Sequence, residues 1–319
     1  MQLNKITTVL SEISGESIGY CQCHEHLFIS KGQSYNINPA LFFCDKDKTL
    51  KELKNYKILG GSTVVDAQPV GCNRMAEELA YVAEESGVNI IASTGFHKMC
   101  FYPSGHWIFT MNELELQKIF IHELEVGMYI QCDSEFPKYD IKHKAGIIKT
   151  AWDVEHLSMQ YQKLFNAAVS AALKTKKTIM IHIEKGTDVF LLFDYLIGAG
   201  IKAENLIFCH LDKACDNLDV HKELCRRGSY LEYDTIGRFK YHSDACEINI
   251  IQEIIYAGYE NQLLFSLDTT RERLESYGGM TGLTYILTEF IPAMRKAGIT
   301  EEQIHKMYYE NCKRALLYS

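Results

Sequence analysis

The sequence predicts an α/β fold of the (β/α)8, or TIM-barrel, type, formed as a single domain over residues 1–319. Three observations lead to this prediction: the chain length, a regular alternation of strand and helix patterns, and polar residues near the ends of apolar strands. A chain of 319 residues is long for an ordinary domain but suits such a barrel, which typically needs ~250 residues or more. Apolar residues make up 47% of the chain and charged residues 23%, a globular composition that can fill a large core.

Eight short runs rich in β-branched residues are the candidate strands. They cover residues 18–27, 62–68, 89–97, 145–152, 178–186, 205–213, 229–237 and 262–270. Helical periods separate them, the first two ending in glycine as helices often do; they include 48–60, 74–87, 154–176 and 301–317. This alternation implies parallel strands with right-handed crossovers, and eight such units close most naturally into a barrel. The alternative, a doubly wound open sheet, needs a glycine-rich phosphate turn after the first strand, and this sequence has none there.

The candidate strands carry polar side chains near their carboxyl ends. Because successive side chains on a strand point to opposite faces, His182 of the fifth strand faces the barrel while the neighbouring isoleucines face the helices. In the sixth strand, alternation puts His210 on the same face as Phe208. In the fourth and eighth strands, Lys149 and Asp268 face inward. The carboxyl end of the strands is where barrel enzymes keep their reactive groups.

The first strand adds two histidines to this inward set. His24 and His26 lie two residues apart in "CQCHEHLFIS", so both side chains point the same way and can hold one ion. Glu25 points to the opposite face and is not expected to be a ligand. Neutral imidazoles and a carboxylate are ligands for zinc or a similar divalent ion. The predicted metal ligands are His24, His26, Lys149, His182, His210 and Asp268.

Lys149 is the unusual member of the set. An ammonium group among metal ligands makes no chemical sense, whereas a neutral lysine that has reacted with carbon dioxide is a carbamate, which can bridge two ions. A lysine near cations has a lowered pKa and can exist in that reactive form. Each residue alone has a simpler interpretation: a strand-end histidine is often a hydrogen-bonded core residue, and Asp268 could cap the next segment. Their common face and matching depth favour a metal site.

The charge distribution argues against macromolecular partners. The formal net charge is −8 and the basic residues are scattered, which disfavours nucleic acid or an acidic membrane surface and leaves room for a local pocket for a small anion. No stretch has the apolar length of a signal peptide or a membrane span, so a cytoplasmic location is expected. The 11 cysteines include no CxxC pair and are expected to be reduced, mostly buried thiols.

Several short motifs resemble those of one family, the phosphotriesterase-like lactonases of the amidohydrolase superfamily. The first strand, "GYCQCHEHL", resembles the pattern Gly-x-Thr-x-Thr-His-Glu-His, with Cys21 and Cys23 in place of threonines. "AGIIKT" matches the segment of a carbamylated lysine, "IHIE" and "CHLD" match the histidine strands, and "SLDTTR" matches the eighth-strand aspartate. "ENCKRAL" is similar to the terminal Asn-Pro-x-Arg segment, with Cys312 replacing proline. The likeness covers nearly the whole chain.

The resemblance implies a centre of two divalent ions, zinc or alternatively manganese or cobalt, and a common reaction. A hydroxide that bridges the ions attacks the substrate, and Asp268, the implied catalytic residue, takes the proton and delivers it toward the leaving oxygen. Relatives are commonly dimers, so a homodimer is expected. The implied ligands are His24, His26 and Asp268 for the more buried ion, His182 and His210 for the more exposed ion, and carbamylated Lys149 for both.

Loops after the third, seventh and eighth strands suggest the substrate class. Several cations near one mouth of an acidic protein favour an anionic substrate, and arginine suits phosphate because its planar group can donate two bonds at once. Alternatively, the loop arginines form ion pairs with Glu272 and Glu275. The candidate substrate-binding residues are His97, Lys98, Arg238, Arg271, Arg273 and Tyr277.

A branch of the family acts on phosphorylated furanose lactones, so hydrolysis of such a small-molecule lactone is the predicted function. The alternatives on the same scaffold are an organophosphate triesterase and a lactonase or carboxylesterase for unphosphorylated substrates. A non-enzymatic metal-binding relative would be expected to lack a ligand, and all six are present.

Overall fold

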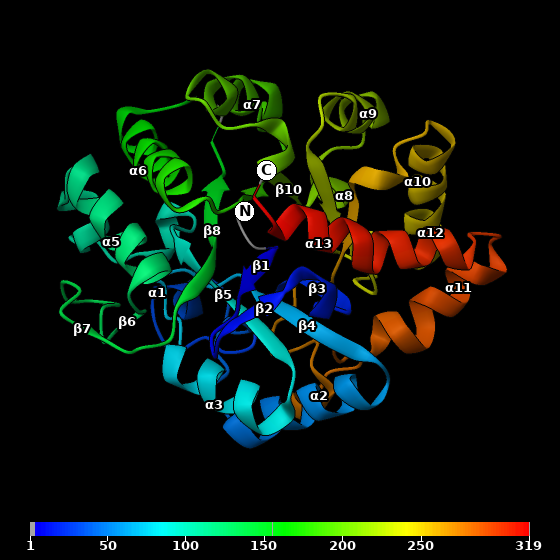
Figure 1. Ribbon diagram of the computed structural model, residues 1–319, viewed down its shortest axis with the longest axis horizontal. Helices are drawn as coiled ribbons and strands as arrows, with labels where there is room; N and C mark the ends of the chain where they lie inside the picture. The colour runs from blue at the N-terminus through cyan, green and yellow to red at the C-terminus, as the bar shows by residue number, and fades with distance from the viewer. Residues whose placement is uncertain (1–3, 155, 319) are drawn as a thin grey trace.

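The computed structural model describes residues 4–154 and 156–318, and its centre is a barrel of parallel strands surrounded by helices (Figure 1). Each candidate strand of the sequence overlaps one strand of this barrel, so the predicted (β/α)8 fold is confirmed. The strands are hydrogen-bonded in chain order, so each neighbour in the barrel is the next such strand along the sequence. They are β3 (Tyr20–Glu25), β4 (Gly61–Asp66), β5 (Asn89–Gly95), β8 (Ala145–Trp152), β9 (Ile179–Ile183), β10 (Leu206–Cys209), β11 (Tyr230–Tyr233) and β12 (Leu263–Phe265).

The barrel closes between the ends of β12 and β3. The backbone N–H of Asp268 donates to the carbonyl of His24 at 3.1 Å. The buried carboxylate of Glu25 accepts the N–H groups of Leu267 at 2.7 Å and Thr269 at 3.0 Å. Glu25 therefore fastens the last strand segment to the first, which agrees with the expectation that it is not a metal ligand.

Two apolar layers follow the alternation of side chains on the strands. Inside the barrel, Cys21, Val65, Ile147 and Met180 belong to one buried cluster. Outside it, the helices pack on alternate strand residues such as Ile181. The assignment of the isoleucines of β9 to the helix-facing side is thus confirmed.

Helices connect the strands and form the outer ring. The predicted helix 154–176 begins later, at Met159, because the Ser158 side chain caps its first turn by accepting the N–H of Tyr161. The predicted helix 301–317 is three consecutive pieces, with a π-helical turn at Lys306–Glu310 in the middle. The helices are α1 (Gln33–Ile37), α2 (Lys46–Ile58), α3 (Ala76–Ser86), α4 (Trp107–Thr110), α5 (Glu113–Glu125), α6 (Met159–Thr175), α7 (Val189–Gly198), α8 (Leu211–Ala214), α9 (Leu218–Arg226), α10 (Asp244–Tyr256), α11 (Ile291–Lys296), α12 (Glu301–His305) and α13 (Asn311–Leu316).

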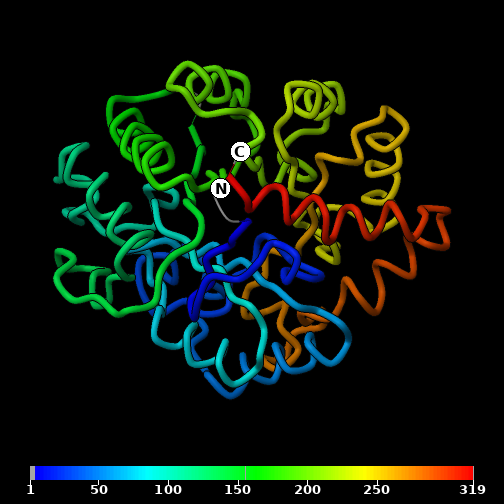
Figure 2. Tube along the Cα trace, in the orientation of Figure 1, coloured from blue at the N-terminus to red at the C-terminus, as the bar shows by residue number. Residues whose placement is uncertain are grey.

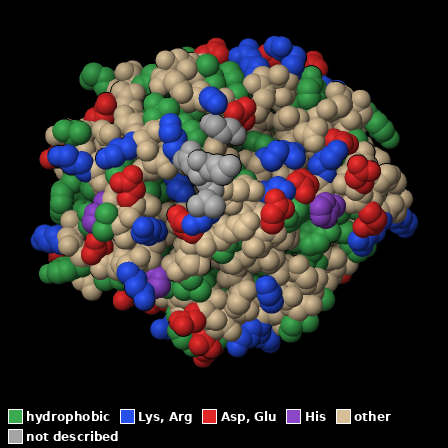
Figure 3. All heavy atoms as spheres, in the orientation of Figure 1, with side chains coloured by type: hydrophobic (Ala, Val, Ile, Leu, Met, Phe, Trp, Pro, Cys, Tyr) green, Lys and Arg blue, Asp and Glu red, His purple; other side chains and the backbone are tan. Residues whose placement is uncertain are grey.

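The amino end of the barrel is covered by the two ends of the chain. A short hairpin, β1 (Lys5–Thr7) and β2 (Glu12–Ser14), lies with α13 across this end, as Figures 1 and 2 show. Ile6 of the hairpin and Leu316 of α13 belong to the same buried cluster as the barrel interior. On this face acidic and basic side chains are interspersed (Figure 3), as the scattered charges of the sequence indicate.

A second hairpin, β6 (Tyr129–Ile130) with β7 (Tyr139–Asp140), precedes β8. Neither hairpin is predicted from the sequence, because strands of two or three residues are too short to show an alternating pattern. No helix in the described part of the chain combines the length and the apolar character needed to cross a bilayer.

Candidate metal centre

The six predicted metal ligands lie together at the carboxyl end of the barrel. Lys149 is completely buried, and its Nζ atom is 2.9 Å from Nε2 of His24. Nδ1 of His182 is 2.7 Å from Nε2 of His210. One carboxylate oxygen of Asp268 lies 3.5 Å from Nε2 of His26 and 3.9 Å from Nε2 of His24. The structure therefore assembles side chains from β3, β8, β9 and the ends of β10 and β12 around one point.

Local irregularities of the backbone, and not the simple alternation of side chains along a strand, direct several of these ligands into the barrel. A register shift in the pairing of β3 with β4, between Gln22 and Glu25, turns both Cys23 and His24 to the inside. His210 has a left-handed backbone (φ 67°) and so does Asp268 (φ 49°). Non-glycine residues with this backbone are uncommon and occur often at functional sites.

The left-handed residue at the end of β10 also corrects the predicted facing of Phe208. Alternation groups Phe208 with His210, but Phe208 packs outside the barrel, with its ring 6.4 Å from that of Phe193 on α7. Ile207 and Cys209 are the inward residues of β10. His210 reaches the interior only because its backbone leaves the strand conformation.

Burial favours the neutral form of three histidines at the centre. It is the largest influence, lowering the pKa of His182 to about 3 and those of His24 and His210 well below the ordinary value. Burial also lowers the pKa of Lys149. These shifts favour the forms that have a lone pair for a cation or, at Lys149, for carbon dioxide.

Asp234, directly after β11, orients the imidazole of His210 and lies close to a second one. Its Oδ1 is 2.5 Å from Nδ1 of His210, with which it forms a hydrogen bond. Its Oδ2 is 3.3 Å from Nδ1 of His24, but these two atoms form no hydrogen bond. Sequence analysis missed this residue, although Tyr230 of the same strand faces inward and an alternation of two continues from it through Glu232 to Asp234. A buried carboxylate hydrogen-bonded to a metal-binding imidazole fixes its tautomer and ring orientation.

The hydrogen-bond partners show why a cation fits here. Nδ1 of His210 lies within hydrogen-bond distance of Asp234, and Nε2 of His182 lies 3.0 Å from Glu184. The other nitrogens of the two rings are 2.7 Å apart and form a hydrogen bond when one of them carries a proton. When Asp234 and Glu184 instead accept the ring protons, both of these nitrogens present lone pairs to the same space, which is the arrangement in which imidazoles hold a divalent ion.

Asp268 is held as a carboxylate by an arginine. Burial, the largest single influence, opposes its ionisation, but Arg238, with Nη1 2.9 Å from Oδ2, acts together with His26 and His210 to hold the pKa of Asp268 well below its usual range. A second guanidinium nitrogen donates to the carbonyl of Asp268 at 2.5 Å. Arg238 thus fixes both the charge and the position of Asp268.

A cavity of about 630 Å³ opens onto the centre. Four of the six predicted substrate-binding residues line it, namely His97, Lys98, Arg238 and Arg273. Lys213 and Lys240 line it as well, and Phe101, Phe239, Tyr241 and Met280 provide apolar surface. Lys213 was not identified from the sequence because it lies in the short helix α8 beyond the strand.

Besides Arg238, which is paired with Asp268, two more of these cations are already engaged. The Arg273 guanidinium donates to the carbonyls of Leu267 and Ile236, so its role in the structure is to hold the loop after β12. Lys98 is paired with Glu184 at 2.6 Å. Among the described residues, Lys213 has no carboxylate partner within ion-pair distance and lies 5.5 Å from the centre of the Tyr241 ring.

The structure does not bring the remaining two candidates to the cavity. The Tyr277 hydroxyl lies 2.9 Å from that of Thr49 and 2.7 Å from the carbonyl of Asp45, both in or next to α2. Arg271 contributes its backbone N–H to Ala40 and is not among the residues that line the cavity. Glu272 lines the cavity, but no ion pair between it and a loop arginine is present among the described residues.

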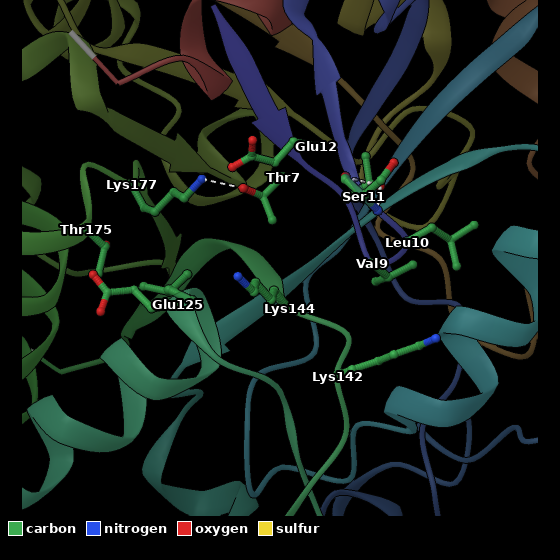
Figure 4. A pocket seen from close by; sticks show the side chains of 12 residues that line it. Thr7, Val9, Leu10, Ser11, Glu12, Glu125, Lys142, Lys144, Thr175 and Lys177 are labelled. Atoms are coloured by element: carbon green, nitrogen blue, oxygen red, sulfur yellow. Dashed lines mark hydrogen bonds between the residues drawn. The ribbon is translucent and has the colours of Figure 1, made fainter. Parts of the chain in front are cut away.

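A second cavity, of about 400 Å³, lies at the opposite end of the barrel (Figure 4). It contains Lys142, Lys144 and Lys177, the last donating to the Thr7 hydroxyl at 2.7 Å. No histidine lines it.

Comparison with known proteins gives a consistent result. The model of the phosphotriesterase family matches residues 4–316. A phospho-furanose lactonase from Mycoplasmopsis synoviae is 28% identical, with 98% of this chain and 91% of that protein aligned. The phosphotriesterase homology protein of Escherichia coli is 28% identical, over 94% of this chain and 98% of its own. The crystal structure of an amidohydrolase from Mycoplasma synoviae superposes with a TM-score of 0.93 at 26% identity, covering 100% of this chain and 93% of that one.

Proposed function

The chain belongs to the phosphotriesterase family and is a hydrolase of ester bonds, and we propose that it uses two divalent metal ions to open the ring of a phosphorylated furanose lactone. The observation that carries this proposal is the cluster of buried imidazoles, two of whose nitrogens lie 2.7 Å apart, beside a buried lysine and an ionised aspartate. Imidazole nitrogens and a carboxylate gathered at one point are a ligand set for a divalent ion.

The proposed ligands are the six residues brought together at the carboxyl end. Zinc suits imidazole and carboxylate donors, and manganese or cobalt is the alternative. When bound, the two ions polarise the lactone carbonyl and lower the pKa of water. His24, His26 and Asp268 would hold one ion and His182 and His210 the other, with Lys149, which lies 2.9 Å from His24, as a further ligand of the pair.

Lys149 is proposed to act as a carbamate. Its neutral amine adds to carbon dioxide, the new N–C bond forms, and one proton leaves, so a neutral donor becomes an anionic one. The lowered pKa of Lys149 favours the neutral amine that this step requires. A Lys149→Ala protein should lose activity and recover part of it with a short-chain carboxylate, which can replace the missing carbamate. Full activity without any addition would contradict the role of Lys149.

Asp268 is proposed as the group that moves the proton. It is ionised and so able to take a proton from attacking water and pass it to the leaving oxygen of the ring. Arg238 keeps the carboxylate in one orientation through its 2.9 Å contact. The proton has only a short distance to travel, because Asp268 is itself one of the proposed metal ligands.

The substrate is proposed to carry a phosphate because the cavity holds unpaired positive charge. Lys213 has no acidic partner among the described residues, and Lys240 lines the same cavity. Two relatives are named phospho-furanose lactonases. Fixed cations in a cavity attract and orient an anionic substrate.

A panel of lactones with and without a terminal phosphate, followed by proton release, tests the proposal. The phosphorylated furanose lactones should give the highest kcat/KM, and a chelator should abolish hydrolysis until metal is restored. Equal rates on unphosphorylated lactones would remove the phosphate from the proposal. Hydrolysis of organophosphate triesters alone would favour the triesterase alternative.

A further inference from the structure

Three buried cysteines meet where the two ends of the chain cross the amino end of the barrel. Cys21 and Cys23 lie on β3, and Cys312 lies in the first turn of α13. All three side chains are completely buried, and their Sγ atoms lie within 4.8 Å of one another. These are the residues that stand in place of the threonines and the proline of the resembling motifs, and the proposed lactonase chemistry does not use them.

The strand and helix direct the three sulfur atoms toward one another. A Cys-x-Cys pair on a strand places both side chains on one face, and the Sγ atoms of Cys21 and Cys23 are 3.8 Å apart. The residue between them, Gln22, points away and donates its side-chain amide to the carbonyl of Leu283. Asn311 anchors α13 by donating to the carbonyls of Glu260 and Leu263, at 2.8 and 2.7 Å, which fixes Cys312 beside the pair.

This geometry is compatible with a thiolate metal site, although the 3.8 Å contact of Cys21 and Cys23 is also a hydrogen bond between thiols. In a tetrahedral site with zinc–sulfur bonds of ~2.3 Å, neighbouring sulfur atoms lie ~3.8 Å apart. The measured Cys21–Cys23 separation agrees with this value. The Sγ atom of Cys312 is 3.7 Å from the carbonyl oxygen of Cys21 and 3.6 Å from that of Met307, so oxygen atoms also border the cluster.

We propose that Cys21, Cys23 and Cys312 bind a third metal ion, a thiophilic divalent ion of the zinc class. Such an ion would join the first barrel strand to the last helix and so act in stability and not in catalysis. The proposal does not depend on the proposed lactonase function, because none of its ligands belongs to the centre at the carboxyl end. The alternative, three thiols packed as small apolar groups, makes a different prediction for metal content.

Cobalt substitution of the full-length protein tests this site. Cobalt bound to thiolates gives an intense near-ultraviolet charge-transfer band, which nitrogen and oxygen ligands do not give. Wild-type protein should show the band and bind about three ions per chain, counting the two of the proposed centre. A wild-type protein that binds two ions or fewer and shows no band would overturn the proposal without any variant.

Two matched variants test which cysteines give rise to the charge-transfer band. Cys312→Ser should lose the band and one ion, keep its lactone-hydrolysis rate at 25 °C, and unfold at a lower temperature than wild type when both are saturated with metal. Cys209→Ser is the control, because Cys209 is a buried thiol near His24 and not in the cluster; it should keep the band. A band that survives Cys312→Ser but not Cys209→Ser would assign the sulfur to the other centre and overturn the proposal. Should Cys312→Ser not fold, the zinc form of wild type can be examined by X-ray absorption, where the absence of sulfur around zinc would contradict it.

Discussion

The two ends of the barrel differ in how their polar groups are satisfied. At the carboxyl end, imidazole nitrogens face each other and a lysine is completely buried without a carboxylate partner within hydrogen-bond distance among the described residues. At the amino end, Lys177 donates to Thr7, and Glu12 pairs with Lys5 at 3.0 Å. Both ends have a cavity lined by lysines. The comparison teaches that a buried cluster of metal-ligand side chains, and not a cavity lined by charged residues, distinguishes the reactive end.

The largest effect should come from the carboxyl-end carboxylate itself. Asp268→Asn keeps the shape of the side chain but removes its charge and its ability to accept a proton. We expect kcat to fall by roughly 10³-fold or more, since a metal ligand and a proton acceptor are lost together. The measurement is steady-state hydrolysis of a phosphorylated lactone at saturating metal. A loss smaller than about tenfold would mean that the two ends of the barrel differ less than their structures suggest.

A smaller effect should follow from substitution of Asp234, whose side chain lies behind the histidine ligands. Asp234→Asn replaces the carboxyl oxygen that lies 2.5 Å from Nδ1 of His210, and loss of such a partner commonly weakens metal binding by about 10–100-fold. Metal affinity can be measured by competition with a chromophoric chelator. Glu232→Gln is the matched control, because Glu232 is also buried on β11 but bonds to Ser266 and stays 3.9 Å from Nδ1 of His24, and it should change affinity less. If the two variants weakened metal binding equally, Asp234 would have no special role in orienting the metal-binding imidazole.

Selection of phosphorylated over unphosphorylated substrates should depend on Lys213, the cavity lysine that has no acidic partner among the described residues. Lys213→Met should raise KM for phosphorylated lactones by about tenfold, because loss of a charged hydrogen bond removes ~1.5–3 kcal/mol, and should leave unphosphorylated lactones nearly unaffected. Lys142→Met, in the amino-end cavity, should change neither KM. A parallel rise for both substrates with Lys213→Met would mean that the lysine supports the structure of the cavity and does not select phosphate.

The buried histidines should make metal-free protein sensitive to acid. Their folded-state pKa values are lowered, to about 3 for His182, whereas an unfolded histidine titrates near ~6.5. Below pH ~6.5 the unfolded chain therefore binds more protons than the folded chain, and the free energy of unfolding falls as the pH falls. Each such histidine contributes up to ~1.4 kcal/mol per pH unit in that range. Urea unfolding of chelated protein between pH 7 and 4 measures this slope, and His210→Asn should make it shallower; an unchanged slope would contradict the neutral state of His210 in the fold.

The smallest effect should come from the amino-end cavity. Lys144→Ala, in a cavity that contains no histidine, should leave kcat and KM within about twofold of wild type, since surface substitutions rarely act at a distance. Steady-state kinetics with the phosphorylated lactone test this. A change in kcat or KM much larger than twofold would show that the amino-end cavity influences the centre at the carboxyl end.

The barrel itself was predictable because its strands are buried on both faces and read as continuous β-branched runs. The inward positions of Lys149 and His182 followed from alternation alone. Alternation predicts the inward position of His210 correctly but wrongly groups it with Phe208. The left-handed backbone of His210 interrupts the two-residue period of the strand and cannot be predicted from that period. Asp234 has the same alternation signal as the ligands, but it lies in none of the motifs that resemble those of the family.

The loop residues were the least predictable. Tyr277 meets Thr49 and Asp45, and Arg273 meets main-chain carbonyls of two loops. Such contacts depend on how distant loops pack, which neither periodicity nor composition records. The sequence could therefore indicate that cations gather after the seventh and eighth strands without indicating which of them face the substrate.

The central claim is that the donors at the carboxyl end form a two-metal hydrolytic centre. The most direct test is to titrate metal-free protein with zinc while the opening of a phosphorylated furanose lactone is followed by proton release. Using Cys312→Ser removes any contribution of the thiol cluster to metal uptake. The account predicts no hydrolysis without metal and a rate that rises to a plateau at about two ions per chain. Hydrolysis that proceeds equally well in metal-free protein would contradict it.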